Sequence, residues 1–143
     1  MINTMHTVNQ KFRILPVTRY GVLISLVLCL SCSDRPNPVT YYFDPVNGND
    51  RNTGTHVSKP FRSLARIGDL KLKPGDSILL KGGTVFTETI TMHCKGSLDH
   101  PIVIGRYGNP ERPLIAADGK KEAAVHLVNS EHFVIRDLEL SNN

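Results

Sequence analysis

Short apolar runs separated by turn-forming residues dominate the chain after residue 40. The runs are rich in β-branched and aromatic residues, and Gly, Pro, Asn or Asp stands in each gap. Such segments are typical of β-strands bounded by turns. The sequence therefore predicts an all-β fold, with strands in segments 40–43, 77–81, 85–92, 101–105, 113–116, 124–128 and 132–140.

A repeat links three of these segments. Pairs of apolar residues separated by one position recur at a nearly constant interval, in Ile78-x-Leu80, Ile102-x-Ile104 and Val125-x-Leu127. One such unit cannot bury its own apolar face, so the repeat favours the stacked units of a solenoid. An antiparallel sandwich also has short strands joined by turns, and it remains the alternative at this point.

One helix is predicted after residue 40, and it begins at Pro60. Apolar residues follow Pro60 at helical spacing, with Ser58 as the candidate N-cap and Gly68 as the candidate end. The segment Lys73-Pro-Gly-Asp76 then predicts a turn.

The N-terminal segment has the pattern of an export signal. Three basic residues, Lys11, Arg13 and Arg19, precede an apolar stretch over 22–30. As a helix this stretch would span about 14 Å, well short of the roughly 30 Å hydrocarbon core of a bilayer. The length and the basic flank favour a secretory signal over a membrane-spanning or core helix.

The end of this segment resembles the lipobox of bacterial lipoproteins. Leu30-Ser31-Cys32 places a small residue directly before a cysteine, although Cys29 stands where the pattern prefers Leu. The resemblance implies lipid attachment at Cys32, a signal peptide over 1–31, a tether over 32–40 and anchoring to the cell envelope. A cleaved signal without a lipid, and hence a secreted protein, is the alternative.

Charge and cysteine content narrow the function classes. The net charge of +4 arises mostly from the basic residues ahead of the apolar stretch, so the exported part is nearly neutral and nucleic-acid binding is excluded. Cys94 is the one cysteine after Cys32. It therefore has no partner for an internal disulfide, and we expect a buried small apolar residue rather than a nucleophile.

Several strings along the exported part resemble the pectate-lyase-like right-handed parallel β-helix proteins. They are the segments Tyr41–Asp50, Lys59–Leu64, Lys73–Gly83, Pro101–Ile115 and His132–Leu140. The resemblance covers residues 41–143. It implies the fold more specifically than the activity, since the family includes polysaccharide lyases, glycosidases and members without a known reaction.

The resemblance implies that 41–143 forms the N-terminal cap and first coils of a right-handed parallel β-helix, with the helix after Pro60 as the cap. The sequence ends directly after a strand, so we expect a chain truncated after its first coils. The parent is expected to be a polysaccharide lyase that performs β-elimination on uronic-acid polymers. The resemblance implies no cofactor in this chain, while lyases of this fold often use Ca²⁺ to neutralise the sugar acid. A glycosidase, a non-catalytic glycan-binding module, and a fragment without independent function are the alternatives.

The family's catalytic groups lie on central coils that this chain does not reach, so no catalytic, cofactor or metal residue is assigned here. The loop after residue 43 contains four side chains with oxygen donors that a calcium ion could use: Asp44, Asn47, Asn49 and Asp50. This loop lacks the glycine and glutamate positions of an EF-hand. We therefore expect these side chains to bind turn amides instead.

The remaining polar candidates have ordinary explanations. The histidines lack metal-ligand spacing and are predicted to be surface residues; they are His93, His100, His126 and His132. Asp118, Asp137 and Glu139 could form a group of acids facing a sugar, but Asp137 and Glu139 are expected to share the solvent face of one strand. Arg106 and Tyr107 are candidates for stacking on a sugar.

Overall fold

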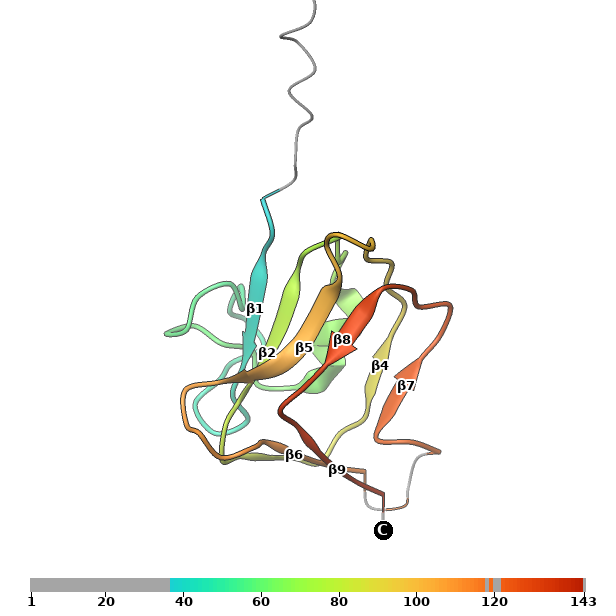
Figure 1. The fold of residues 1–143 in the computed structure, drawn as a ribbon. Helices are drawn as coiled ribbons and strands as arrows, with labels where there is room; N and C mark the ends of the chain where they lie inside the picture. Colours follow the sequence, from blue (N-terminus) through green and yellow to red (C-terminus); the bar gives the residue numbers. More distant parts are fainter. Residues whose placement is uncertain (1–36, 118, 120–121, 143) are drawn as a thin grey trace, which may run out of the picture. The chain divides into compact units, whose positions relative to one another are not determined.

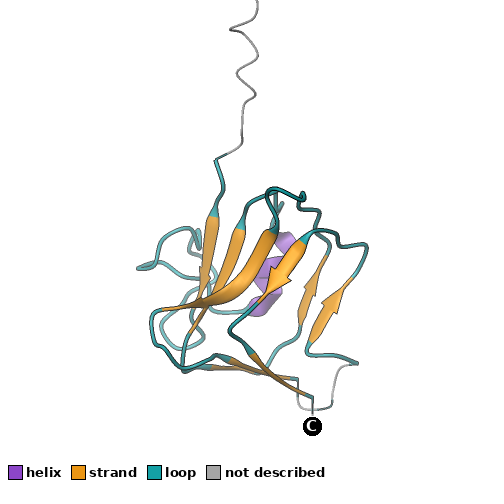
Figure 2. Cartoon of the chain, viewed as in Figure 1, coloured by secondary structure: helices purple, strands orange, loops and turns teal. Residues whose placement is uncertain are grey.

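The computed structural model describes residues 37–117, 119 and 122–142, and almost all of its regular structure is β. Figures 1 and 2 show the strands with one short helix behind them. The strands are β1 (Thr40–Phe43), β2 (Ser77–Lys81), β3 (Val85–Phe86), β4 (Ile90–Met92), β5 (Ile102–Tyr107), β6 (Leu114–Ala116), β7 (Val125–Leu127), β8 (Phe133–Ile135) and β9 (Glu139–Ser141). The all-β prediction is confirmed. The predicted signal peptide and Cys32 lie outside the described residues.

The strands form three parallel sheets, which the chain visits in turn. Their orders are β1-β2-β5-β8, β3-β6-β9 and β4-β7, and every pairing between these strands is parallel (Figure 1). Each pass through the sheets is one coil, and the next coil adds a strand to each ladder. Parallel pairing requires such crossovers and cannot arise from hairpins. The alternative of an antiparallel sandwich is therefore wrong.

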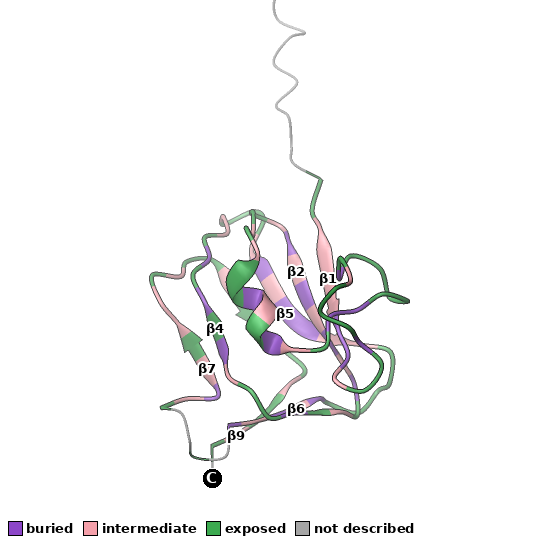
Figure 3. Cartoon of the chain, turned by 180° about the vertical axis from the view of Figure 1, so that it is seen from behind, coloured by how far each residue is buried: buried purple, intermediate pink, exposed green. Residues whose placement is uncertain are grey.

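Alternating side chains of the three sheets meet in one apolar core, which Figure 3 shows as buried segments. In β2 and β4 the apolar residues at every second position are buried and those between them are more exposed. This is the period of two that strand geometry imposes. The fully buried core side chains are Phe43, Leu64, Ile67, Ile78, Leu80, Ile90, Met92, Ile102, Ile104 and Ile115.

The stacking register corrects the repeat predicted from the sequence. Ile78 lies opposite Ile104 rather than Ile102, and Ile104 lies opposite Ile135 of the next coil. Val125 belongs to another sheet, where it pairs with Ile90. The near-constant interval was therefore a coincidence, because the coils differ in length and their turns carry the difference.

The segment 85–92 is two strands rather than one. Phe86 is buried and Val85 is 53% exposed. Residues 87–89 turn the chain from the second sheet to the third, where Ile90 begins β4. The turn interrupts the burial at Glu88, which is exposed, so the two buried strand segments do not form one continuous strand.

The helix begins later than predicted. The backbone of Phe61 exchanges hydrogen bonds with β1: its N–H donates to the carbonyl of Tyr42 at 2.9 Å and its carbonyl accepts from Asp44 at 2.8 Å. A residue whose backbone is paired in this way cannot start a helix. The Oγ of Ser58 instead lies 2.7 Å from Nδ1 of His56.

The helix that forms is the 3₁₀ helix η2, Leu64–Asp69. Ser63 is its N-cap, with Oγ accepting from the N–H of Ala65 at 3.1 Å, and it runs through Gly68, the predicted end. Leu64 and Ile67 are buried and pack against the side of β4. Within the described part of the chain, no helix is long and apolar enough to cross a bilayer.

Candidate functional site

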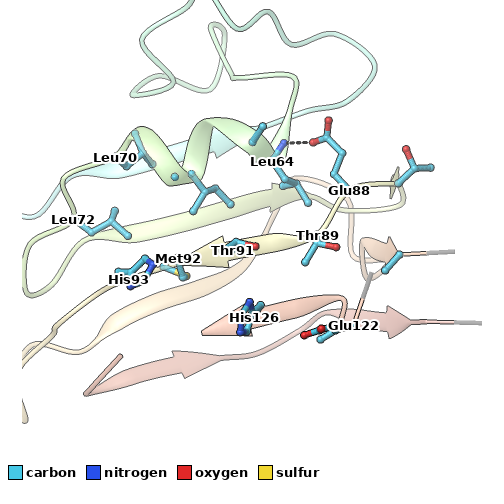
Figure 4. A pocket seen from close by; sticks show the side chains of 16 residues that line it. Leu64, Leu70, Leu72, Glu88, Thr89, Thr91, Met92, His93, Glu122 and His126 are labelled. Carbon is cyan, nitrogen blue, oxygen red and sulfur yellow. Dashed lines mark hydrogen bonds between the residues drawn. The ribbon is translucent and has the colours of Figure 1, made fainter. Parts of the chain in front are cut away.

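A groove of about 930 Å³ runs between η2, β4 and the segment that enters β7 (Figure 4). One side is apolar and comes from η2 and the residues after it, including Ile67, Leu70 and Leu72. The opposite side is polar and comes from the strand pair β4-β7. The groove is therefore amphipathic across its width.

The polar side is a row of alternate residues that runs from the residue before β4 to the residue after it. Thr89, Thr91 and His93 line the groove, while the residues between them are buried in the core. His126 of β7 is the register partner of Thr91, so it extends the row onto the next strand. Thr91, His93 and His126 are exposed and can hydrogen-bond to a ligand.

Glu88 joins the groove to the helix. Its carboxylate accepts a hydrogen bond from Oγ of Ser63 at 2.9 Å and another from the backbone N–H of Leu64 (Figure 4). These are the donors at the start of η2, which lack partners inside the helix. Glu88 therefore holds η2 beside β4 and keeps the groove's two sides in place.

The charged residues that line the groove are both acidic. They are Glu88 and Glu122, and the described lining contains neither Lys nor Arg. The imidazoles of His93 and His126 are the other titratable groups of the described lining, and Lys120 and Lys121 lie outside the described residues. The carboxylates of the described lining disfavour an anionic ligand.

The four predicted surface histidines are exposed, as expected. The structure brings His93 and His126 to the same groove, whereas His100 and His132 lie outside its lining. Among the residues with described positions, no group of three or more His, Cys, Asp or Glu side chains could hold a metal ion. Cys94 is buried, with 4% of its surface exposed, which confirms its predicted place in the core.

The predicted acids are not brought together on one strand face. Asp137 lies in the corner between β8 and β9 with a φ of 57°, and Glu139 begins β9 in another sheet. The predicted shared face is therefore wrong, because the chain turns between the two residues. Asp118 lies outside the described residues.

Arg106 and Tyr107 lie away from the groove and are engaged with their neighbours. Nη1 of Arg106 donates to the carbonyl of Asn109 at 3.0 Å. The ring of Tyr107 meets Tyr42 edge-on at 5.1 Å between centroids, and Nζ of Lys81 lies 5.1 Å from the ring centre. Stacking of Tyr107 on a sugar would have to displace these contacts.

The surroundings of Tyr107 also disfavour its phenolate. Burial, followed by the nearby carboxylate of Asp44 and by Tyr42, raises the pKa of Tyr107 to about 12. The phenol therefore stays protonated at neutral pH and acts as a packed, neutral ring rather than a base.

In the loop after β1, the prediction that side chains bind turn amides is confirmed for Asp44 and Asn49. Asp44 is buried and accepts from the N–H groups of Val46 and Asn47 at 2.9 and 3.0 Å. Burial alone would raise the pKa of Asp44, but these hydrogen bonds, the amide of Asn47 and the charge of Lys81 together lower it. Asp50 differs from the prediction, because its Oδ1 accepts from the distant backbone N–H groups of Arg62 and Ser63 rather than from a turn amide.

The acids and threonines of the groove were not among the predicted site residues. Glu88, Thr89 and Thr91 stand in the segment 85–92, which was predicted as one strand. The alternation from Thr89 to His93 was the available signal for an outward polar row. Glu122 carried no comparable signal.

Comparison with known proteins gives relatives that are much longer than this chain. No family model matches. A lacto-N-biosidase of Bifidobacterium longum subsp. longum is 39% identical over 89 residues, which cover 57% of this chain and 6% of that protein.

Solved structures give the same picture of the fold. The GH136 lacto-N-biosidase of Eubacterium ramulus matches with a TM-score of 0.67 and 32% identity, over 73% of this chain and 20% of that chain. A rhamnogalacturonan lyase matches with a TM-score of 0.56 and 22% identity, over 71% of this chain and 28% of that chain. The chain thus spans about a fifth of the solved lacto-N-biosidase, and its ladders of parallel strands are shared with carbohydrate-active proteins of two reaction types.

Proposed function

We propose that this chain forms the N-terminal coils of a right-handed parallel β-helix protein that acts on carbohydrates. The passage of the chain through three parallel ladders supports the β-helix. The likeness to the lacto-N-biosidases supports the carbohydrate role. In this proposal η2 covers the beginning of the third ladder, where β4 has no earlier strand beside it.

The proposed reaction of the whole protein is hydrolysis of glycosidic bonds. The observation that carries it is the 39% identity to a lacto-N-biosidase. The β-elimination expected from the sequence has weaker support, because the lyase likeness at 22% identity concerns the fold alone.

Product analysis of the longer protein that contains these coils tests this proposal. The protein would be incubated with oligosaccharides that contain lacto-N-biose and, in parallel, with pectin and rhamnogalacturonan. We expect products that have gained water and no new ultraviolet absorbance from a carbon–carbon double bond. Unsaturated products would assign the protein to the lyases, and glycan binding without any product would favour a non-catalytic module.

We also propose that the protein is exported and attached to the cell envelope through a lipid on Cys32. The basic and apolar pattern before Cys32 supports this placement. We expect the natural chain to enter the detergent phase of a Triton X-114 extraction and the Cys32→Ala variant to leave it. Equal partitioning of the two chains would reject the anchor and favour a secreted protein.

A further inference from the structure

We propose that the groove between η2 and the β4-β7 strand pair is a binding subsite for an uncharged sugar. This inference rests on the proposed carbohydrate role and adds to it a location in this chain and a class of ligand. Four features of the groove carry it: its polar row, its apolar side, its charge and the open space at Gly68.

The polar row can satisfy the hydroxyl groups of a sugar. Thr91 and His93 follow one another on the outward face of β4, and their side chains are about 7 Å apart along the strand. His126 stands beside Thr91 on β7. Hydroxyl and imidazole groups both donate and accept hydrogen bonds, as sugar hydroxyls require.

The apolar side of the groove suits the faces of a sugar ring, because these faces present C–H groups. The partly buried Leu70 and Leu72 supply this side, and the fully buried Ile67 anchors η2 to the core. Ligand sites in proteins commonly combine such apolar contacts with a few placed polar groups. A sugar ring that lies over the groove can therefore contact Leu70 and Leu72 through its C–H groups and the polar row through its hydroxyl groups.

The described carboxylates of the groove disfavour uronic acids. Glu88 and Glu122 belong to its described lining, which contains no cation that could pair with a sugar carboxylate; Lys120 and Lys121, just before Glu122, lie outside the described residues. A uronate placed beside two carboxylates would meet like charge in a partly dehydrated space, which is unfavourable. The groove thus favours an uncharged sugar over the uronic-acid polymers expected from the sequence.

Gly68 leaves the groove open on the helix side. A Cβ built at Gly68 meets no other atom within 4 Å, so a side chain there would extend into free space rather than into the core. Gly68 lines the groove and lies on η2. A large residue at this position should therefore block the groove without disturbing the packing of Leu64 and Ile67.

The test measures binding of tetrasaccharides to the full chain by isothermal titration calorimetry. The probes are cellotetraose and tetra-N-acetylchitotetraose, which are uncharged, and tetragalacturonate, which has the same number of rings and carries carboxylates. We expect one of the uncharged probes to bind at least about tenfold more tightly than tetragalacturonate. Gly68→Trp should weaken that binding by about tenfold or more while the circular dichroism spectrum is unchanged.

A matched pair of histidine variants keeps the test decisive if Gly68→Trp does not fold. His126→Ala removes an exposed groove residue and should weaken binding by about three- to tenfold, the loss of one hydrogen bond. His100→Ala removes an exposed histidine outside the groove lining and should leave binding unchanged.

Three results would overturn the inference: no binding of either uncharged probe, equal binding of tetragalacturonate, or equal effects of His126→Ala and His100→Ala. Each is distinguishable from failure of the proposed reaction, which is measured on the longer protein through its products. Hydrolysis by the longer protein, together with no sugar binding by this chain, would reject the subsite and leave the proposed reaction standing.

Discussion

Replacing Asp76 with alanine is expected to lower the free energy of unfolding by about 3 kcal/mol or more. Asp76 is 3% exposed, and each of its carboxylate oxygens accepts one backbone N–H at 2.8 Å, from Val39 and from Lys73. The side chain thereby ties the segment before β1 to the turn before β2. Alanine would leave both amides without this charged acceptor, and hydrogen bonds to charged groups contribute about 1.5–3 kcal/mol each.

Urea unfolding of the full chain, followed by circular dichroism, measures this loss. Asp76→Asn keeps the shape and one acceptor oxygen, so we expect about half the effect of alanine. Asp69→Ala is the matched control, since Asp69 is an exposed acid that pairs with Arg66 at 2.6 Å and should contribute less than about 1 kcal/mol. Equal losses in Asp76→Ala and Asp69→Ala would show that the two buried hydrogen bonds are not needed for stability.

Only one of the two hydrogen bonds of Asp76 could be predicted from the sequence. The turn Lys73-Pro-Gly-Asp76 was predicted because its residue types act locally, and the bond from Lys73 to Asp76 lies within that turn. The bond from Val39 joins residues far apart in the chain. It depends on the pairing of β1 with β2, which no local pattern specifies.

The same distinction separates the correct from the incorrect strand predictions. The strands around Leu79 and Val103 were found because β-branched and apolar runs between turn residues are local signals. The pairing of Val125 with Ile90 was missed, because coils of unequal length remove any fixed sequence interval. The start of the helix was missed because Phe61 pairs with Phe43, a tertiary contact that overrides local helical spacing.

The candidate site was hidden for a related reason. His93 and His126 were each recognised as surface residues, which they are. Their common groove exists because β7 pairs with β4 and because Glu88 binds the start of η2. The residue types were visible in the sequence, but the contacts that bring them together depend on the stacking of the coils.

The second large effect is expected from Ile104, which is fully buried in the middle of the first sheet. It lies between Ile78 of the preceding coil and Ile135 of the next. Ile104→Ala would remove three carbons from a closely packed stack and leave a cavity, at a cost of about 4 kcal/mol. Ile104→Val removes one carbon and should cost about 1 kcal/mol. A loss that grows with the number of carbons removed would show that packing is the cause, whereas equal losses would mean that any substitution at this position is destabilising.

The position of Ile104 within the stack gives a sharper test than its burial alone. Ile135 has the same side chain in the next coil but is only partly buried, because no described strand lies on its far side. Ile135→Ala should therefore cost clearly less than Ile104→Ala, about 1 to 2 kcal/mol. An equal loss would contradict the structure's exposed edge at β8 and would mean that something covers it in solution. Repeating the unfolding measurement at tenfold lower chain concentration would identify a second copy as the cover, since a loss caused by self-association falls on dilution.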